Sequence, residues 1–111
     1  MVEVIYSIEQ IEGIIAPIAE KYRIPAVYLF GSYARGTQNE GSDIDFLVDT
    51  KGTELKGLFA LGGLYSELEE AFQVPVDMVT LNSVEQPPQR PAERHFKDNV
   101  MRERKMIYAV S

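Results

Sequence analysis

LFGSYARG, residues 29–36, and SDIDFLVD, residues 42–49, are the two segments that decide the fold. The apolar run Ala26–Phe30 predicts a buried strand, and the small and polar residues after it predict a loop over 31–42. Ser32–Arg35 has the length to begin a short helix inside that loop. Asp43–Asp49 predicts a second strand, because apolar and acidic residues alternate along it. One face of this strand carries Ile44, Phe46 and Val48, and the other carries Asp43, Asp45, Leu47 and Asp49.

Helices and further strands alternate along the rest of the chain, which predicts one α/β or α+β domain over residues 1–111. The first helix is expected over Ser7–Tyr22, with a capping box from Ser7 and Gln10 and a kink or break at Pro17. Gly62 and Gly63 lie inside the second expected helix and are expected to mark close packing. The remaining expected elements are a helix over Thr53–Phe72, a strand over Val74–Thr80, a loop over Asn82–Pro91, a helix over Pro91–Arg104 and a strand over Lys105–Val110.

The composition is that of an ordinary globular protein, with 45% hydrophobic and 25% charged residues. The absence of cysteine excludes disulfide scaffolds and thiolate zinc sites. No apolar run reaches the roughly 20 residues that span a bilayer. Met1–Gln10 lacks the basic and apolar regions of a signal peptide, so we expect a cytoplasmic protein with no membrane partner. The formal net charge of −6 disfavours direct binding to nucleic acid, because such binding draws its affinity from positive charge.

Asp43 and Asp45 are the first candidate site residues. Aspartates separated by one strand residue point the same way, and carboxylates held this close repel each other unless a cation lies between them. Hard oxygen ligands suit Mg²⁺, which takes its remaining ligands from water and substrate phosphates. The alternative is a solvated acidic face on an edge strand. A calcium loop of the EF-hand type is excluded, because Leu47 and Val48 stand where that loop needs a polar ligand and a glycine.

Gly31, Ser32 and Arg35 form the second candidate group. Glycine at a strand end lets backbone N–H groups approach a phosphate, serine adds a hydroxyl donor, and arginine adds a fixed cation. Arg35 could also pair with a nearby carboxylate. The alternative for the whole group is a strand-ending turn, with Arg35 on the surface. A P-loop is excluded, because Thr37 and Gln38 stand where its Lys and Ser/Thr are required.

Together the two groups resemble the signature of the DNA polymerase beta-like nucleotidyltransferase superfamily, and most of all its minimal nucleotidyltransferase (MNT) members. The matching motif is Gly31-Ser32, Arg35-Gly36 and Ser42-Asp43-Ile44-Asp45, with Val48-Asp49 closing the strand. The resemblance implies a mixed β-sheet with helices packed mainly on one face. It also implies a third carboxylate on a neighbouring strand, for which Asp77 is the candidate, since it is the lone acid in an apolar strand. An acid at a strand edge is the alternative for this residue.

The resemblance implies a magnesium-dependent transfer of a nucleoside monophosphate. Asp43, Asp45 and Asp77 would hold two Mg²⁺ ions roughly 4 Å apart, while Gly31, Ser32 and Arg35 orient the triphosphate of ATP or another NTP. Attack at the α-phosphorus would release pyrophosphate, and Asp77 would take the acceptor proton. MNT proteins are typically antitoxins of HEPN-domain ribonuclease toxins. The resemblance therefore implies adenylylation of a hydroxyl on such a toxin, and a hetero-oligomer with it.

Two other functions remain open at this point. One is an antitoxin that neutralises its partner by contact, without catalysis. The other is a transferase that acts alone on a small molecule, which the lack of an acceptor domain disfavours. Tyr33, beside Ser32, is the aromatic residue to examine for a nucleotide contact, although core packing is the commoner role. His95, the only histidine, is expected on the surface.

Overall fold

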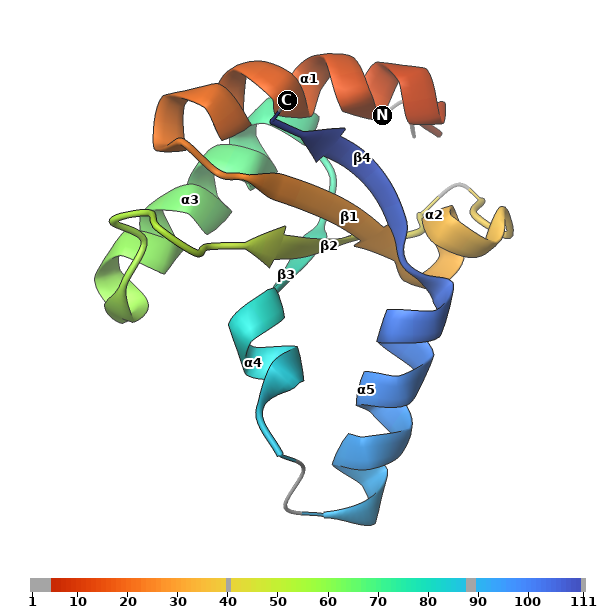
Figure 1. The fold of residues 1–111 in the computed structure, drawn as a ribbon. Coiled ribbons are helices and arrows are strands. Elements are labelled where there is room, and N and C mark those ends of the chain that lie inside the picture. Colours follow the sequence, from red (N-terminus) through yellow and green to blue (C-terminus); the bar gives the residue numbers. More distant parts are fainter. Residues whose placement is uncertain (1–4, 40, 88–89, 111) are drawn as a thin grey trace.

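A four-stranded sheet in the order β3-β2-β1-β4 forms the centre of the computed structural model, which describes residues 5–39, 41–87 and 90–110. β1 runs antiparallel to β2 and to β4, whereas β2 and β3 are parallel, so the sheet is mixed, as predicted (Figure 1). The strands are β1 (Ala26–Phe30), β2 (Ile44–Asp49), β3 (Val76–Thr80) and β4 (Lys105–Ala109). The helices are α1 (Ile8–Tyr22), α2 (Gly31–Arg35), α3 (Gly57–Phe72), α4 (Leu81–Glu85) and α5 (Pro91–Glu103).

Helix α1 begins and continues as its sequence dictates, with one exception at Pro17. The Ser7 hydroxyl accepts from the Gln10 N–H at 3.1 Å, and the Gln10 side chain accepts from the Ser7 N–H at 2.8 Å, which confirms the capping box. Pro17 does not split the helix. Because proline has no N–H, the Gly13 carbonyl lacks its usual donor four residues later. Pro17 and Gly13 both lie away from the buried side of α1, so this carbonyl can face water.

The two longest helices, α1 and α3, cover one face of the sheet, as predicted. Ile44, Phe46 and Val48 of β2 are all buried on this face, which confirms the predicted alternation. The rings of Phe46 and Phe72 lie 5.3 Å apart between centroids and tie β2 to the last turn of α3. This face therefore holds the main core. No helix in the described ranges is long and apolar enough to cross a bilayer.

Three expectations about local structure were wrong. Helix α3 begins at Gly57 rather than Thr53, because the buried Thr53 hydroxyl donates to the Thr50 carbonyl at 2.7 Å and holds a turn there. Gly62 and Gly63 do not mark close packing, since a Cβ at either would meet no heavy atom within 4 Å. The loop expected over Asn82–Pro91 instead begins with part of helix α4, which extends to Glu85. Residues 88 and 89 of the expected loop lie outside the described residues.

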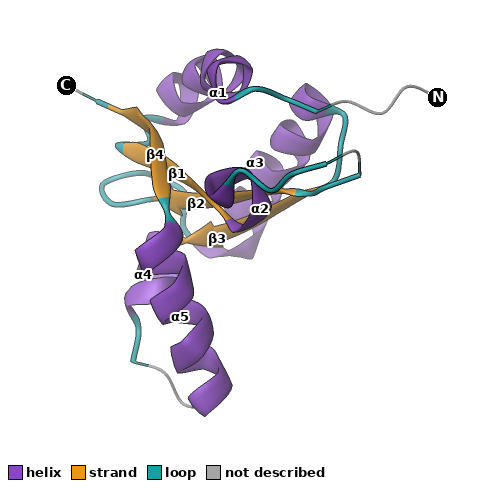
Figure 2. Ribbon diagram, turned by 90° about the vertical axis from the view of Figure 1, so that its right-hand side faces the viewer, coloured by secondary structure: helices purple, strands orange, loops and turns teal. Residues whose placement is uncertain are grey.

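The second face of the sheet carries a smaller core beneath α4 and α5. Both helices extend away from one end of the sheet, on the side opposite α1 (Figures 1 and 2). Side chains at odd positions of β2 and β3 point to this face, because strand side chains alternate. The buried residues of this smaller core are Phe30, Leu47, Leu81, Val84 and Val100.

Candidate functional site

Three aspartates lie near one another where β2 and β3 begin, on the second face of the sheet. Asp45 and Asp77 are register partners on these parallel strands, and the Ile44 N–H donates to the Pro75 carbonyl at 3.1 Å, which fixes this end of the pair. Asp43 lies two residues before Asp45, so its side chain points the same way. Asp45 is half-buried, whereas Asp43 and Asp77 are exposed. Asp77 is thus an acid on an edge strand, and it is also the register partner of Asp45 on the neighbouring strand.

The electrostatics of Asp45 show that its negative charge is poorly compensated. Burial and the neighbouring carboxylates of Asp77 and Asp43 raise the pKa of Asp45 to about 6, and Arg35 partly opposes this rise. The repulsion expected from the sequence is therefore present in the fold. A divalent cation between these carboxylates would relieve it.

Gly31 brings the backbone of the β1–α2 turn directly against Asp45. Its φ is +71°, and a Cβ at this position would lie 2.1 Å from Asp45 Oδ2. Phe30, the preceding residue, is the register partner of Asp45 on β1. Only glycine satisfies both the backbone conformation and the close approach. Of the expected Gly-Ser pair, Gly31 therefore lies against Asp45, and Ser32 follows it, half-buried, in the first turn of α2.

Arg35 ends helix α2 and pairs with a carboxylate that the sequence does not single out. Its Nη1 donates to Glu103 Oε2 at 3.0 Å. The structure shows Arg35 exposed and paired with a carboxylate, and this partner comes from α5. Glu103 stands between Arg102 and Arg104 in a charged run, so no local signal separates it from its neighbours.

The donor set fits a hard divalent cation in its chemistry. Asp43, Asp45 and Asp77 offer only carboxylate oxygens, which are the ligands that Mg²⁺ prefers. Within the described part of the chain, no three acidic or histidine side chains are gathered closely enough to hold a metal ion as they stand. The carboxylates would therefore need small side-chain adjustments around an ion, which the exposure of Asp43 and Asp77 permits.

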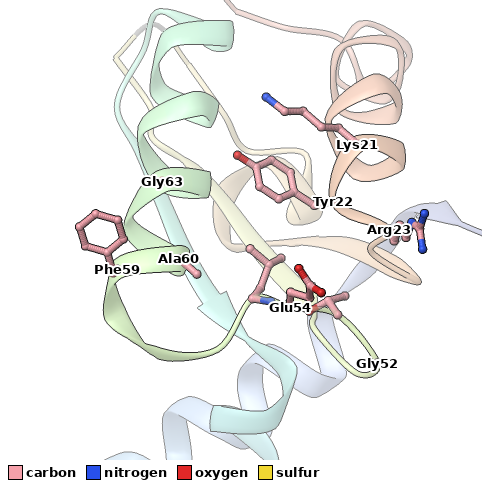
Figure 3. A pocket seen from close by; sticks show the side chains of 10 residues that line it. Lys21, Tyr22, Arg23, Gly52, Glu54, Phe59, Ala60 and Gly63 are labelled. Carbon is pink, nitrogen blue, oxygen red and sulfur yellow. Dashed lines mark hydrogen bonds between the residues drawn. The ribbon is translucent and has the colours of Figure 1, made fainter.

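Two cavities among the described residues lie away from this site. One of about 710 Å³ is lined by the end of α1, the loop before α3 and the first turns of α3 (Figure 3). Lys21 and Tyr22 line it from α1, and Phe59 and Ala60 from α3. Neither this cavity nor a second of about 420 Å³ is lined by any of the six candidate residues. The carboxylate site is a better candidate for function than these cavities. It brings together negatively charged side chains and a backbone turn that packs closely against one of them.

The positions of Tyr33 and His95 decide their roles. Tyr33 is buried, and its hydroxyl accepts from the Tyr6 N–H at 3.2 Å, so it is a core residue and not a nucleotide contact. His95 is exposed on α5, as expected.

Comparison with known proteins agrees with this geometry. A model of the nucleotidyltransferase domain family matches residues 11–107. A relative from Methanocaldococcus jannaschii, named a putative protein adenylyltransferase, is 44% identical over 78 residues, covering 70% of this chain and 82% of the relative. The protein adenylyltransferase MntA of Thermococcus cleftensis is 33% identical over 82 residues, covering 70% of this chain and 81% of MntA.

Solved structures give the same result for the fold. A crystal structure of a toxin-antitoxin with AMP-PNP matches with a TM-score of 0.67 and 25% identity. The match covers 90% of this chain and 74% of that one. The family model spans nearly the whole chain, including all three aspartates and both strands, β2 and β3, beside which they lie. This chain therefore belongs to the nucleotidyltransferase domain family, as one of its minimal nucleotidyltransferases.

Proposed function

We propose that this nucleotidyltransferase transfers AMP from ATP to a hydroxyl group of a partner protein, and that Asp43, Asp45 and Asp77 carry the reaction. The observation that supports this most is the side-by-side register of Asp45 and Asp77, with the Gly31 turn packed onto Asp45. Carboxylates and a phosphate-accessible backbone turn are thereby placed within one small area. Acids on a solvated face would have no need of that turn.

Mg²⁺ is the cofactor that this site fits, and Asp43, Asp45 and Asp77 would hold it. Three carboxylates are the donor set that we expect for two ions. Bound there, the metal would neutralise both the carboxylates and the triphosphate charge. We expect Mg²⁺ to be required for transfer, because without it the crowded carboxylates would repel the nucleotide.

The chain's own groups divide the remaining work. The Gly31 N–H and the Ser32 hydroxyl bind β- and γ-phosphate oxygens, and Arg35 adds a positive charge beside them. Asp77, exposed at the sheet edge, takes the proton of the acceptor hydroxyl. The acceptor oxygen then forms a bond to the α-phosphorus while the bond to the β-phosphate oxygen breaks. Pyrophosphate leaves, and the acceptor keeps AMP as a phosphodiester.

The partner is proposed to be a HEPN-domain toxin, for which this chain is the antitoxin. The family resemblance supplies the HEPN identity of that partner. The relatives support protein as the acceptor class, since one carries the name protein adenylyltransferase MntA and a similar fold occurs in a toxin-antitoxin with AMP-PNP. Asp43 and Asp77 are exposed, so a second protein can approach the site and complete it. The cytoplasm, where ATP is present, is the expected location, and we expect a hetero-oligomer there.

Transfer of label from ATP tests the proposal. The protein is incubated with α-labelled ATP, Mg²⁺ and the candidate toxin, and label on the toxin is measured by gel and mass spectrometry. Asp77→Asn should lower the transfer rate at least about 100-fold, because it removes a ligand and the proposed base together. Asp49→Asn is the matched control: it changes the same charge on the same face of the sheet, at the other end of β2.

The outcomes separate the two functions that remain. Label on the toxin with the wild type and Asp49→Asn, but not with Asp77→Asn, supports the transferase. If the wild type labels no toxin, yet still blocks toxicity, the chain is a contact antitoxin and the proposal is wrong. Equal transfer by Asp77→Asn would remove Asp77 from the reaction.

A further inference from the structure

Glu103 reaches the candidate site through the pairing of the last strand. It is the final residue of α5, and Lys105, the first residue of β4, is the register partner of Leu29 on β1. Leu29 lies two residues before Gly31. The corner between α5 and β4 therefore stands beside the β1–α2 turn, although Glu103 and Arg35 are 68 positions apart in the sequence.

The corner that carries Glu103 is well anchored. Val100, one turn earlier, is buried with 3% exposure, and the Arg104 N–H donates to its carbonyl at 2.9 Å. The Arg104 guanidinium lies 4.7 Å from the centroid of the Tyr28 ring on β1. The rings of Phe96 and Phe30 meet edge to face at 6.2 Å. The backbone at Glu103 is therefore fixed by contacts of the residues before it and after it, which limits where its carboxylate can lie.

The Arg35 side chain is less fixed by its surroundings than the Glu103 side chain. Its side chain is 49% exposed, whereas that of Glu103 is 28% exposed. Arg35 follows Gly31 by four residues, so the two share one side of α2, and Gly31 touches Asp45. Helix α2 is only five residues long, so Arg35 ends it about 6 Å along the helix axis from Gly31. One N–H given to Glu103 leaves the guanidinium with further donors for a phosphate.

We propose that Glu103 is a positioning residue that holds the Arg35 guanidinium at the edge of the carboxylate site, ready to meet the triphosphate. This inference rests on the proposed function, because it assumes an NTP at Asp43, Asp45 and Asp77. An arginine side chain loses considerable conformational entropy when it is fixed in one position. The ion pair with Glu103 fixes Arg35 before the nucleotide binds, so this entropy is not lost on binding. Helix α5 thus takes part in nucleotide binding without touching the nucleotide.

A competing role for Glu103 predicts the opposite result. If its carboxylate drew Arg35 away from the phosphate, removing the charge would tighten nucleotide binding. The positioning role instead predicts weaker binding. The direction of the change in KM for ATP therefore decides between the two roles.

The test compares KM and kcat for ATP in AMP transfer by the wild type, Glu103→Gln, Arg35→Ala and the double variant. Glu103→Gln should raise KM about two- to fivefold, the range for a partly exposed ion pair, with little change in kcat. Arg35→Ala should raise KM about tenfold or more. In the Arg35→Ala background, Glu103→Gln should have no further effect, because its contribution passes through Arg35.

Glu67→Gln is the matched control for general loosening of the fold. Glu67 pairs with Lys21 at the same 3.0 Å distance, has a similar exposure of 30%, and also joins two helices, but it lies on the other face of the sheet. We expect its KM to stay at the wild-type value. A similar rise in KM for Glu67→Gln and Glu103→Gln would overturn the inference.

The remaining outcomes also decide. A Glu103→Gln variant with unchanged or lowered KM, beside an active wild type, contradicts the positioning role and leaves the proposed function intact. If the wild type transfers no AMP but binds ATP in calorimetry, the same variants are compared by Kd with the same expected ratios. If the wild type neither transfers AMP nor binds ATP, the proposed function is wrong and this inference is wrong with it.

Discussion

At the scale of single residues, Gly31 has the most constrained position in the site. Gly31→Ala should lower the free energy of unfolding by about 1–3 kcal/mol, because alanine is strained at a φ of +71°. The new Cβ would also displace the Asp45 carboxylate, whose Oδ2 stands 2.1 Å from the position that this Cβ would take. We expect AMP transfer to fall about 100-fold, the loss that a misplacement of about 1 Å in an active site can cause. Urea unfolding and the transfer assay measure the two effects.

The control for this change is Gly13→Ala. Gly13 lies inside α1, is exposed, and has no heavy atom within 4 Å of the place that an added methyl group would take. Alanine there should raise the free energy of unfolding by about 0.5–1 kcal/mol through helix propensity alone, with transfer unchanged. A Gly31→Ala protein as stable and active as this control would show that the Gly31 turn does not matter.

Asp45 should make the stability of the metal-free protein depend on pH. Its pKa is about 6 in the fold and 3.8 for the free side chain, so the folded state binds its proton more tightly. The contribution of Asp45 to stability therefore falls as pH rises from about 4 to about 6. The whole shift would correspond to roughly 3 kcal/mol, but partial exposure reduces this, and we expect Asp45→Asn to gain about 1 kcal/mol at pH 7.

The measurement is urea unfolding of the wild type and Asp45→Asn in EDTA at pH values from about 4 to 7, which span the titration of this group. The stability difference between the two proteins should grow across that window and then level off. Because both proteins share every other titrating group, the difference reports Asp45 together with its charge interactions with Asp43 and Asp77. A difference that is constant with pH, or that shrinks as pH rises, would contradict the raised pKa.

At the scale of elements, patterns that are local in the sequence were predictable, and contacts between distant segments were not. The alternation along Asp43–Asp49 placed Asp43 and Asp45 on one face, and the lone acid of the third strand pointed to Asp77. Their juxtaposition needs the parallel pairing of β2 with β3. Helix α4 was missed because a Pro- and Gln-rich composition hid Leu81 and Val84, which are buried only because β2 and β3 offer them a second apolar face.

The contact between α2 and α5 shows the same limit for the site itself. Arg35 belonged to a recognisable motif, so its place near the carboxylates was predictable. Glu103 belongs to no such motif, and only the pairing of β4 with β1 brings it close to Arg35. A residue that acts through tertiary pairing leaves no mark in its own neighbourhood of the sequence. The same holds for the start of α3, where a turn held by Thr53 delays the helix to Gly57.

At the scale of the whole molecule, the sheet separates the core that maintains the fold from the carboxylates that are proposed to act. The main core lies under α1 and α3, whereas Asp45 and Asp77 point to the opposite face. Removing metal should therefore leave the fold intact. We expect EDTA to leave the far-UV circular dichroism spectrum unchanged, unlike in domains whose core is a metal site.

Adding Mg²⁺ with a non-hydrolysable ATP analogue should stabilise this same fold by mass action. At about 100 times Kd the gain is about 2.7 kcal/mol, which corresponds to a rise in Tm of roughly 10 °C for a chain of this size. Asp43→Asn with Asp45→Asn should abolish the rise while keeping or raising the stability of the apo protein, because the substitutions relieve repulsion and leave the main core untouched. Asp49→Asn should keep the full rise, since the Asp49 carboxylate accepts from the Lys51 N–H at the far end of β2. A rise in the double variant equal to that of the wild type would show that the nucleotide and its metal bind somewhere other than at these aspartates.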